Sequence, residues 1–222
     1  MSVKLLSESM GATITDEDQV RIEAILEFWF KEQALTAPQI DHRMEIWFGS
    51  DPVFDHEIIK EFGNDVELAS KGKLNYWAES PRGLLALIIL IDQFRRNIYR
   101  NSAQAFSKDR LALKLCVEGA MRKREQNLLP IEKVFFYMPL QHAESRKVQA
   151  KSVELYQRLM ESASPTYRQT FETVLQFAEL HKDIIDRFGR FPHRNQLLDR
   201  ENTPDESEYL SGSSPDFGQG SN

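Results

Sequence analysis

The sequence is poor in the features that mark secreted, membrane-spanning and nucleic-acid-binding proteins. Cys116 is the only cysteine, which excludes an intramolecular disulfide and a zinc cluster built on cysteines. The longest apolar run, residues 84–91, is much shorter than the roughly 20 residues that span a bilayer. The net charge of -6 argues against non-specific binding to nucleic acids, which needs a basic face. We therefore expect a cytoplasmic protein that binds neither nucleic acid nor membrane.

The length and composition predict one globular domain. Hydrophobic residues make up 41% and charged residues 28% of the 222 residues, which is ordinary for a soluble protein and argues against overall disorder. The first residues lack the apolar core of a signal peptide, and the last are rich in serine and glycine. We expect a flexible N-terminus over 1–17, one domain over 18–210 and a disordered tail over 211–222.

Helical periodicity extends over almost the whole chain, and no segment alternates as a β-strand does. Several helices are predicted to begin where a capping residue precedes proline, at Asp51-Pro52, Ser80-Pro81, Ser164-Pro165 and Thr203-Pro204. The longest stripe ends near Phe188, and Gly189 is placed to stop that helix. Pro139 is expected to interrupt the helix that starts at Pro130. This pattern predicts an all-α fold of seven or eight helices that stack as antiparallel hairpins.

A candidate site lies in residues 187–195, where cations, aromatic rings and bends alternate. The polar side chains of this block that we select as ligand-binding candidates are Arg187, Arg190, His193, Arg194 and Asn195. Arginines beside aromatic rings suit the recognition of a carboxylate or another anion. The block therefore predicts an anion site, although it names no reaction.

A second polar cluster follows the apolar run. Asp92 comes directly after it, and Arg95 and Asn97 follow within the next turns. Cations near a helix end can simply cap the helix dipole. However, a carboxylate beside a buried run is costly without a partner. We expect an arginine of residues 187–195 to pair with Asp92.

Two histidine positions complete the candidate set. His142 follows a proline-containing segment and could be oriented by Glu144 as a general base, although Glu144 could equally serve the start of the next helix. His181 lies on the apolar stripe of the longest helix, which suits a core histidine or one that points into a cavity. His42 and His56 read as surface residues, and no spacing fits a metal motif. We expect no metal and no cofactor.

Several strings occur together in an order that resembles a known family. They are Phe28-Trp29-Phe30, Leu74-Asn75-Tyr76-Trp77, residues 85–97 with Asp92-Gln93-Phe94, residues 136–144 and residues 187–195. The sequence resembles, over about residues 20–210, the bacterial and plant family known as domain of unknown function 924. The resemblance implies a tetratricopeptide-repeat-like helical fold and no established activity. Three departures from the family pattern are Arg95 in place of proline, Glu144 shifted by one position and Asp199 in place of glycine.

Three functional hypotheses follow from these residues. The first is a binding module whose arginine- and histidine-lined pocket holds a small anion or a peptide carboxylate. The second is an enzyme of hydrolase or transferase type, in which His142 or His193 moves a proton, Asp92 or Glu144 orients it, and Arg190 and Arg194 stabilise negative charge. The third is a polar network that only locks the helices together. The first two require Asp92, His142, His181 and residues 190–194 to converge.

Overall fold

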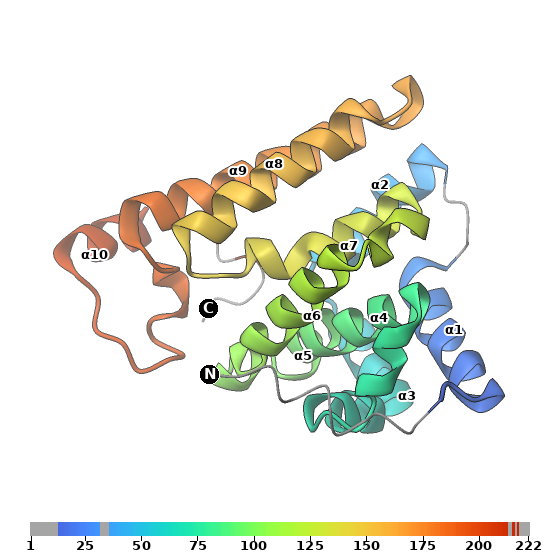
Figure 1. Ribbon diagram of the computed structural model, residues 1–222. Coiled ribbons are helices and arrows are strands. Elements are labelled where there is room, and N and C mark those ends of the chain that lie inside the picture. Colours follow the sequence, from blue (N-terminus) through green and yellow to red (C-terminus); the bar gives the residue numbers. More distant parts are fainter. Residues whose placement is uncertain (1–12, 32–35, 213–214, 216, 218–222) are drawn as a thin grey trace.

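The computed structural model describes residues 13–31, 36–212, 215 and 217, which are helical nearly throughout and contain no strand (Figure 1). The α-helices are α1 (Asp16–Phe30), α2 (Ala37–Phe48), α3 (Pro52–Ser70), α4 (Pro81–Ile88), α5 (Arg95–Ile98), α6 (Asp109–Met121), α7 (Pro130–Gln141), α8 (Arg146–Glu161), α9 (Arg168–Phe188) and α10 (Pro204–Ser211). Short 3-10 turns lie between them: η1 (Asn75–Glu79), η3 (Ala103–Phe106), η4 (Arg124–Asn127), η5 (Pro165–Tyr167) and η6 (Pro192–Arg194). The all-α prediction is confirmed, with more helices than the seven or eight expected.

The helix ends follow the capping signals of the sequence. Asp51 and Ser80 accept hydrogen bonds from backbone N–H groups of the turns that they precede, and α3 and α4 begin at the prolines that follow them. Thr203 and Glu206 form a reciprocal capping box at α10. Gly189 ends α9 in the left-handed conformation, with φ of 73°, which costs glycine little. The expected boundaries at these four places are confirmed.

Pro139 does not interrupt its helix, contrary to the expectation. It lies inside α7, which continues to Gln141. Proline removes one hydrogen bond of the helix and crowds the preceding turn, but the neighbouring side chains of Met138 and Leu140 are buried in the core. Their packing compensates for the lost bond near the end of the helix.

Helix α2 was not expected from the periodicity. Its signal is a capping box, since the backbone N–H of Thr36 donates to Oε1 of Gln39 at 2.8 Å. Trp47 of this helix donates through Nε1 to the carbonyl of Trp29 at 2.9 Å, and its ring packs against Phe135 with centroids 4.7 Å apart. Aromatic packing therefore holds α2 onto α1 and α7.

The apolar run forms the central helix, and its regularity breaks where the polar residues begin. Residues 81–98 run as α4, a π-helical segment η2 (Ile89–Phe94) and α5. Every residue from Gly83 to Arg95 is buried, because α1, α3, α6 and α7 pack around this helix. A π turn is a rare distortion that is frequent at functional sites. Here it contains Asp92.

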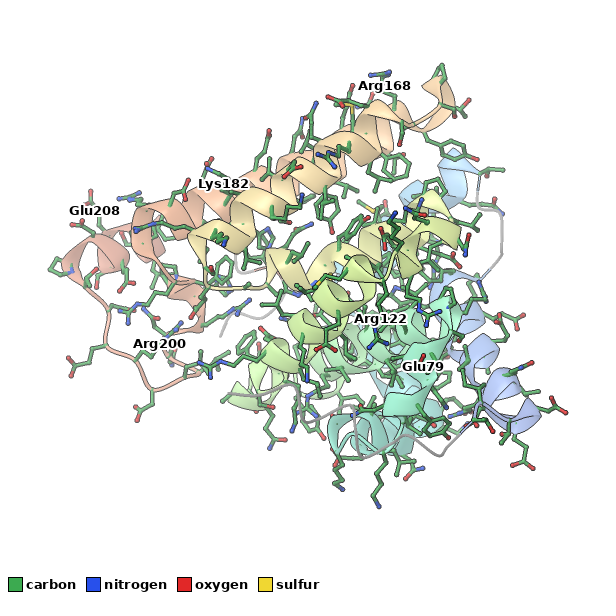
Figure 2. The ribbon with its side chains drawn as sticks, in the orientation of Figure 1. Glu79, Arg122, Arg168, Lys182, Arg200 and Glu208 are labelled. Carbon is green, nitrogen blue, oxygen red and sulfur yellow. The ribbon has the colours of Figure 1, made fainter. Side chains whose placement is uncertain are left out.

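The molecule has a compact body and a long hairpin beside it. Helices α8 and α9 pack against each other along their length, and α7 lies between this hairpin and the helices α1 and α3–α6 (Figure 1). The outer surface carries ion pairs such as Arg122 with Glu79, at 3.4 Å and with side chains 46% and 64% exposed (Figure 2). Such exposed pairs contribute little to stability. Burial of the central helix and the aromatic core therefore carries the fold.

The expected flexible and disordered ends fall mostly outside the described residues. The segments predicted to be flexible at 1–17 and disordered at 211–222 overlap the described part only at residues 13–17, 211–212, 215 and 217. Helix α1 begins at Asp16 and α10 ends at Ser211, while the division into one domain over 18–210 with two unstructured ends stays a prediction. None of the helices in the described ranges combines the length and hydrophobicity that crossing a membrane requires.

Two helical glycines offer a matched test of the core. A methyl group on Gly119 of α6 would lie 2.4 Å from Leu84 and 2.9 Å from Phe136, whereas one on Gly63 of α3 would meet nothing within 4 Å. We expect Gly119→Ala to lower the free energy of unfolding by roughly 1–3 kcal/mol through overpacking. Gly63→Ala should raise it by up to about 1 kcal/mol, because alanine favours the helix. Urea unfolding of both variants measures this, and equal shifts would contradict the close packing of α4, α6 and α7.

Candidate functional site

A cavity of about 200 Å³ opens between α2, the end of the central helix, α7, α9 and η6. Aromatic and aliphatic side chains form much of its wall: Met44, Trp47, Phe48, Phe106, Met138, Val174, Phe177 and Phe217. The polar part of the wall consists of Gln93, Arg96, Asn97, Arg100, Gln141, His142, His181, His193 and Arg194. The cavity is therefore amphipathic, with basic and amide side chains and hydrocarbon side chains in one wall.

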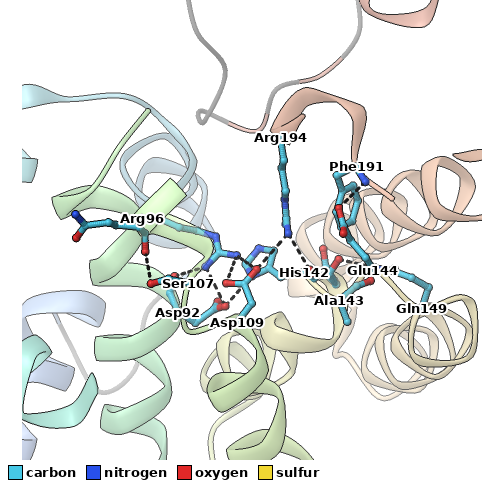
Figure 3. Close-up of polar contacts among 12 residues, drawn as sticks. Asp92, Arg96, Ser107, Asp109, His142, Ala143, Glu144, Gln149, Phe191 and Arg194 are labelled. Carbon is cyan, nitrogen blue, oxygen red and sulfur yellow. Dashed lines mark hydrogen bonds and ion pairs between the residues drawn. The ribbon is translucent and has the colours of Figure 1, made fainter. Parts of the chain in front are cut away.

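Asp92 and His142 form a buried pair at the cavity, where His142 lines the wall and Asp92 lies behind it. Oδ1 of Asp92 lies 2.8 Å from Nδ1 of His142, and Asp92 is fully buried (Figure 3). Arg96 donates to the carbonyl oxygen of Asp92 at 2.7 Å and to its Oδ1 at 3.2 Å, while the amide of Gln93 donates to Oδ2. These contacts satisfy a carboxylate that would otherwise be costly to bury.

A second carboxylate joins two arginines of the wall. Asp109, at the start of α6, accepts two hydrogen bonds from Arg96, both at 3.0 Å. It also accepts one from Nη1 of Arg194 at 3.2 Å, and the same nitrogen lies 3.2 Å from the carbonyl oxygen of His142 (Figure 3). Two arginines and two carboxylates thus form one continuous network. Their formal charges balance.

The network sets the protonation of its members. Burial alone would raise the pKa of Asp92, but the charge of Arg96 and the hydrogen bonds from His142 and Gln93 outweigh it and bring the pKa to about 2. Burial and the charge of Arg96 lower the pKa of His142 despite the neighbouring carboxylate. The imidazole is therefore neutral at neutral pH. Because an ionised carboxylate only accepts hydrogen bonds, Asp92 holds the proton on Nδ1 and leaves Nε2 as an acceptor.

The other two histidines of the cavity are also neutral. Burial lowers the pKa of His181 to about 3 and that of His193 to about 2, and the cationic arginines nearby add to both effects. Nδ1 of His181 lies 2.7 Å from the carbonyl oxygen of Phe177 and so carries the proton. The rings of His142 and His181 have centroids 6.2 Å apart. The cavity wall therefore presents uncharged imidazoles beside paired arginines.

Two ion pairs hold residues 187–195 over the cavity. Glu144 accepts the backbone N–H of Phe191 at 2.9 Å and pairs with Arg200 at 2.8 Å. Arg190 pairs with Glu206 through two hydrogen bonds of 2.7 Å. These contacts fix the loop so that η6 directs Arg194 and His193 inward.

The chain shares its sequence and fold with proteins of one known family. Residues 25–214 match the model of the family described as bacterial protein of unknown function, DUF924. The chain belongs to the DUF924 family. A solved structure, that of the protein of unknown function ATU0120 from Agrobacterium tumefaciens, is similar to this DUF924 protein with a TM-score of 0.74 and 34% sequence identity, covering 87% of this chain and 99% of the other. The search of curated proteins finds no match. The family resemblance inferred from the sequence is thus confirmed. The matched family and the similar structure are both described as being of unknown function, so they indicate the fold and no activity.

The structure brings together some of the predicted site residues of the DUF924 protein. His142, His181, His193, Arg194 and Asn97 line the cavity, and Asp92 lies directly behind His142. The other candidates are engaged elsewhere and do not belong to the cavity wall, since Arg95 bonds Ser70 and Ser107, Arg187 lies over Phe188, Arg190 pairs with Glu206 and Asn195 bonds Asn202. The convergence expected of Asp92, the histidines and Arg194 occurs, without Arg190.

Two expected pairings are wrong. Asp92 pairs with Arg96, four residues along its own helix, and not with an arginine of residues 187–195. Arg194 pairs with Asp109. Glu144 does not orient His142, because it is bound to Arg200 and to the backbone of Phe191. In both cases the carboxylate is bound by partners that the spacing of residues along the chain did not indicate.

Sequence reasoning missed Arg96, Asp109 and Phe217. Arg96 was part of the polar string after the apolar run, but a helix-capping role accounted for it equally well. Asp109 gave only the ordinary signal of an acid in the first turn of a helix. Phe217 lies beyond the helical domain, yet its ring is 4.1 Å from that of His181. Within the described ranges, no group of three or more metal-ligating side chains is arranged to hold a metal ion.

The neutral histidines predict a loss of stability in mild acid. The unfolded chain binds protons as the pH falls below the ordinary histidine pKa of about 6.5, whereas the folded protein, with lowered pKa values at His142, His181 and His193, binds fewer. Unfolding then takes up protons, so the free energy of unfolding should fall between pH 6.5 and 5, by up to about 1.4 kcal/mol per pH unit for each histidine.

Urea unfolding at pH 7, 6 and 5 measures this slope. His193→Gln should make the slope smaller by removing one of the three groups. His42→Gln is the matched control, because the His42 side chain is 73% exposed, and it should leave the slope unchanged. A slope of zero in the native protein would contradict the neutral, buried state of the three rings.

Proposed function

We propose that this protein is a hydrolase in which His142 acts as the general base, oriented by Asp92. The observation that carries the proposal is the hydrogen bond of 2.8 Å between buried Asp92 and Nδ1 of His142, a residue that lines the cavity. A carboxylate behind an imidazole fixes its tautomer and stabilises the imidazolium that forms during proton transfer. No residue in the described ranges bonds Nε2 of His142, which leaves this nitrogen available to substrate or water.

Water is the nucleophile that suits this cavity. Its described lining residues include no serine, threonine, cysteine or lysine, and Cys116 is buried with its pKa raised by desolvation. In the proposed step, Nε2 of His142 takes a proton as water oxygen attacks a carbonyl carbon, and the π electrons move to the carbonyl oxygen. The imidazolium then returns the proton to the leaving group as its bond breaks.

Arg194 and Arg96 are placed to stabilise the oxyanion of such a step. Arg194 reaches the backbone of His142, and Arg96 reaches the carboxylate that holds the imidazole. Burial lowers the pKa of Arg194 to about 10, so it stays cationic at neutral pH. Because both arginines are already paired with carboxylates, the resting cavity favours a neutral carbonyl that acquires charge only in the transition state.

A second candidate is binding without turnover. It keeps the expectation of a tetratricopeptide-repeat-like scaffold, for which the α8–α9 hairpin is suited, and of a small anion or peptide carboxylate as ligand. The observation in its favour is Nε of Arg194, which is buried without a hydrogen-bond partner among the described residues. This candidate assigns no proton transfer to His142.

Turnover of small activated esters tests the proposal. We expect the protein to hydrolyse p-nitrophenyl acetate, butyrate or benzoate, and His142→Ala to lower kcat/KM by roughly 10²- to 10⁴-fold. Asp92→Asn should also lower it, because the amide no longer enforces the required tautomer. His42→Ala, at an exposed position of α2, is the control and should retain full activity. Circular dichroism and melting temperature report whether each variant is folded.

The pH profile adds an independent check. Activity requires neutral His142, so kcat/KM should rise with pH through one ionisation and level off with a midpoint below 6.5, because burial and Arg96 lower the pKa of this imidazole. Turnover of none of these esters, or a folded His142→Ala variant with full activity, would sink the hydrolase proposal. Retention of a co-purifying anion by His142→Ala and its loss in Arg194→Ala would favour the binding candidate.

A further inference from the structure

One wall of the cavity is a cluster of aromatic rings. The ring of Phe217 lies against His181, with centroids 4.1 Å apart and planes 31° apart, and its centroid is 5.3 Å from that of His193. Phe191 supports both imidazoles from behind, at 5.6 Å and 5.5 Å. These separations are those of favourable aromatic contacts. Phe217 is thus seated on a preformed aromatic surface.

The chain holds Phe217 there at some expense to its backbone. Phe217 has φ of 53°, in the left-handed region that is unfavourable for a residue with a side chain. Nδ1 of His193, in the same wall, is buried and has no hydrogen-bond partner among the described residues. A hydrocarbon ring cannot supply that partner. Phe217 therefore matches the shape of this wall while leaving its polar atom unsatisfied.

We propose that the surface formed by His181 and His193 is a subsite for an aromatic ring carrying a hydrogen-bonding substituent, and that Phe217 occupies it in the free protein. The size of the cavity agrees with this class of ligand. Its volume is about 200 Å³, and an engineered protein cavity of about 150 Å³ is known to bind benzene. The space beside Phe217 is thus already large enough for a benzene ring, and withdrawal of Phe217 would open the faces of His181 and His193 to that ring.

The inference deepens the proposed function, on which its catalytic meaning rests. His142 and His181 have ring centroids 6.2 Å apart, so the imidazole of the proposed base is a neighbour of this subsite. The substrate class is then an aryl carbonyl compound, such as an ester or amide of an aromatic acid. Binding of the ring itself requires no turnover.

Ligand binding to the full chain tests the subsite. The probes are benzyl alcohol and cyclohexylmethanol, which share a hydroxymethyl group and differ in aromaticity. Dissociation constants and histidine ring-proton shifts are measured by NMR for the native protein, Phe217→Ala and Phe188→Ala. Phe188 is the matched control, since it packs against the same small cluster but does not line the cavity.

We expect Phe217→Ala to bind benzyl alcohol roughly threefold to tenfold more tightly than the native protein does, because the competing ring is gone. The His181 and His193 resonances should shift on removal of Phe217 and shift back toward their native positions with benzyl alcohol. The affinity for cyclohexylmethanol should increase less on the same substitution, and Phe188→Ala should bind both probes with the affinity of the native protein. Phe217→Leu, which keeps an apolar side chain, should show an intermediate gain.

Two results would overturn the inference. One is equal affinity of the native protein and Phe217→Ala for benzyl alcohol. The other is an equal increase in affinity for benzyl alcohol and cyclohexylmethanol, which would indicate an apolar cavity without preference for an aromatic ring. Neither result depends on ester hydrolysis. A selective gain without any turnover would refute the hydrolase proposal alone, and turnover without a selective gain would refute the subsite alone.

Discussion

The carboxylate of Asp92 is the constraint around which this end of the molecule is organised. It is fully buried at the end of an apolar helix, where an unpaired charge would be costly. Its partners come from its own helix, through Arg96, and from the end of α7, through His142. Arg96 extends the network to Asp109 of α6, and Asp109 to Arg194 of η6. Pairing one buried charge therefore positions four separate segments around one cavity.

Both helices that supply the central pair lack part of the regular α-helical hydrogen bonding next to it. Asp92 lies inside the π-helical segment η2, and Pro139 lies within α7 three residues before His142. Each distortion sacrifices regular hydrogen bonding in a helix that is otherwise buried. A network that only tied helices together could be built on undistorted turns. The placement of both irregularities beside the same pair favours a role that depends on the orientation of these two side chains.

The sequence predicted the helical class and the capped boundaries, because these depend on local chemistry at positions such as Ser80 and Thr203. It predicted the family through strings of residues such as Phe28-Trp29-Phe30. It did not predict α2, whose stability comes from aromatic packing between helices. For the site, the sequence identified most of the side chains that meet, including His142 and Arg194. The partners assigned to them from the sequence were wrong. The pairing of carboxylates with arginines depends on distances between helices, which the sequence does not give. Glu206 pairs with Arg190 and Asp109 with Arg194 because the fold brings them close together, and their spacing along the chain does not indicate this.

The corrected pairings also change what the cavity suits. Had the arginines been unpaired, a free anion would be the natural ligand. With each arginine neutralised by a carboxylate and with the histidines uncharged, an anion would have to displace an existing ion pair or bind beside it. A neutral ligand with an aromatic ring meets no such competition, since the wall offers imidazole and phenyl rings together with hydrogen-bonding side chains. Charge that appears only during a reaction could still be stabilised by the paired arginines, of which Arg194 already donates to the carbonyl oxygen of His142. The balance of charges thus favours recognition of a neutral ligand by shape and aromatic contact. The charges of the arginines would then act only in the proposed proton-transfer step.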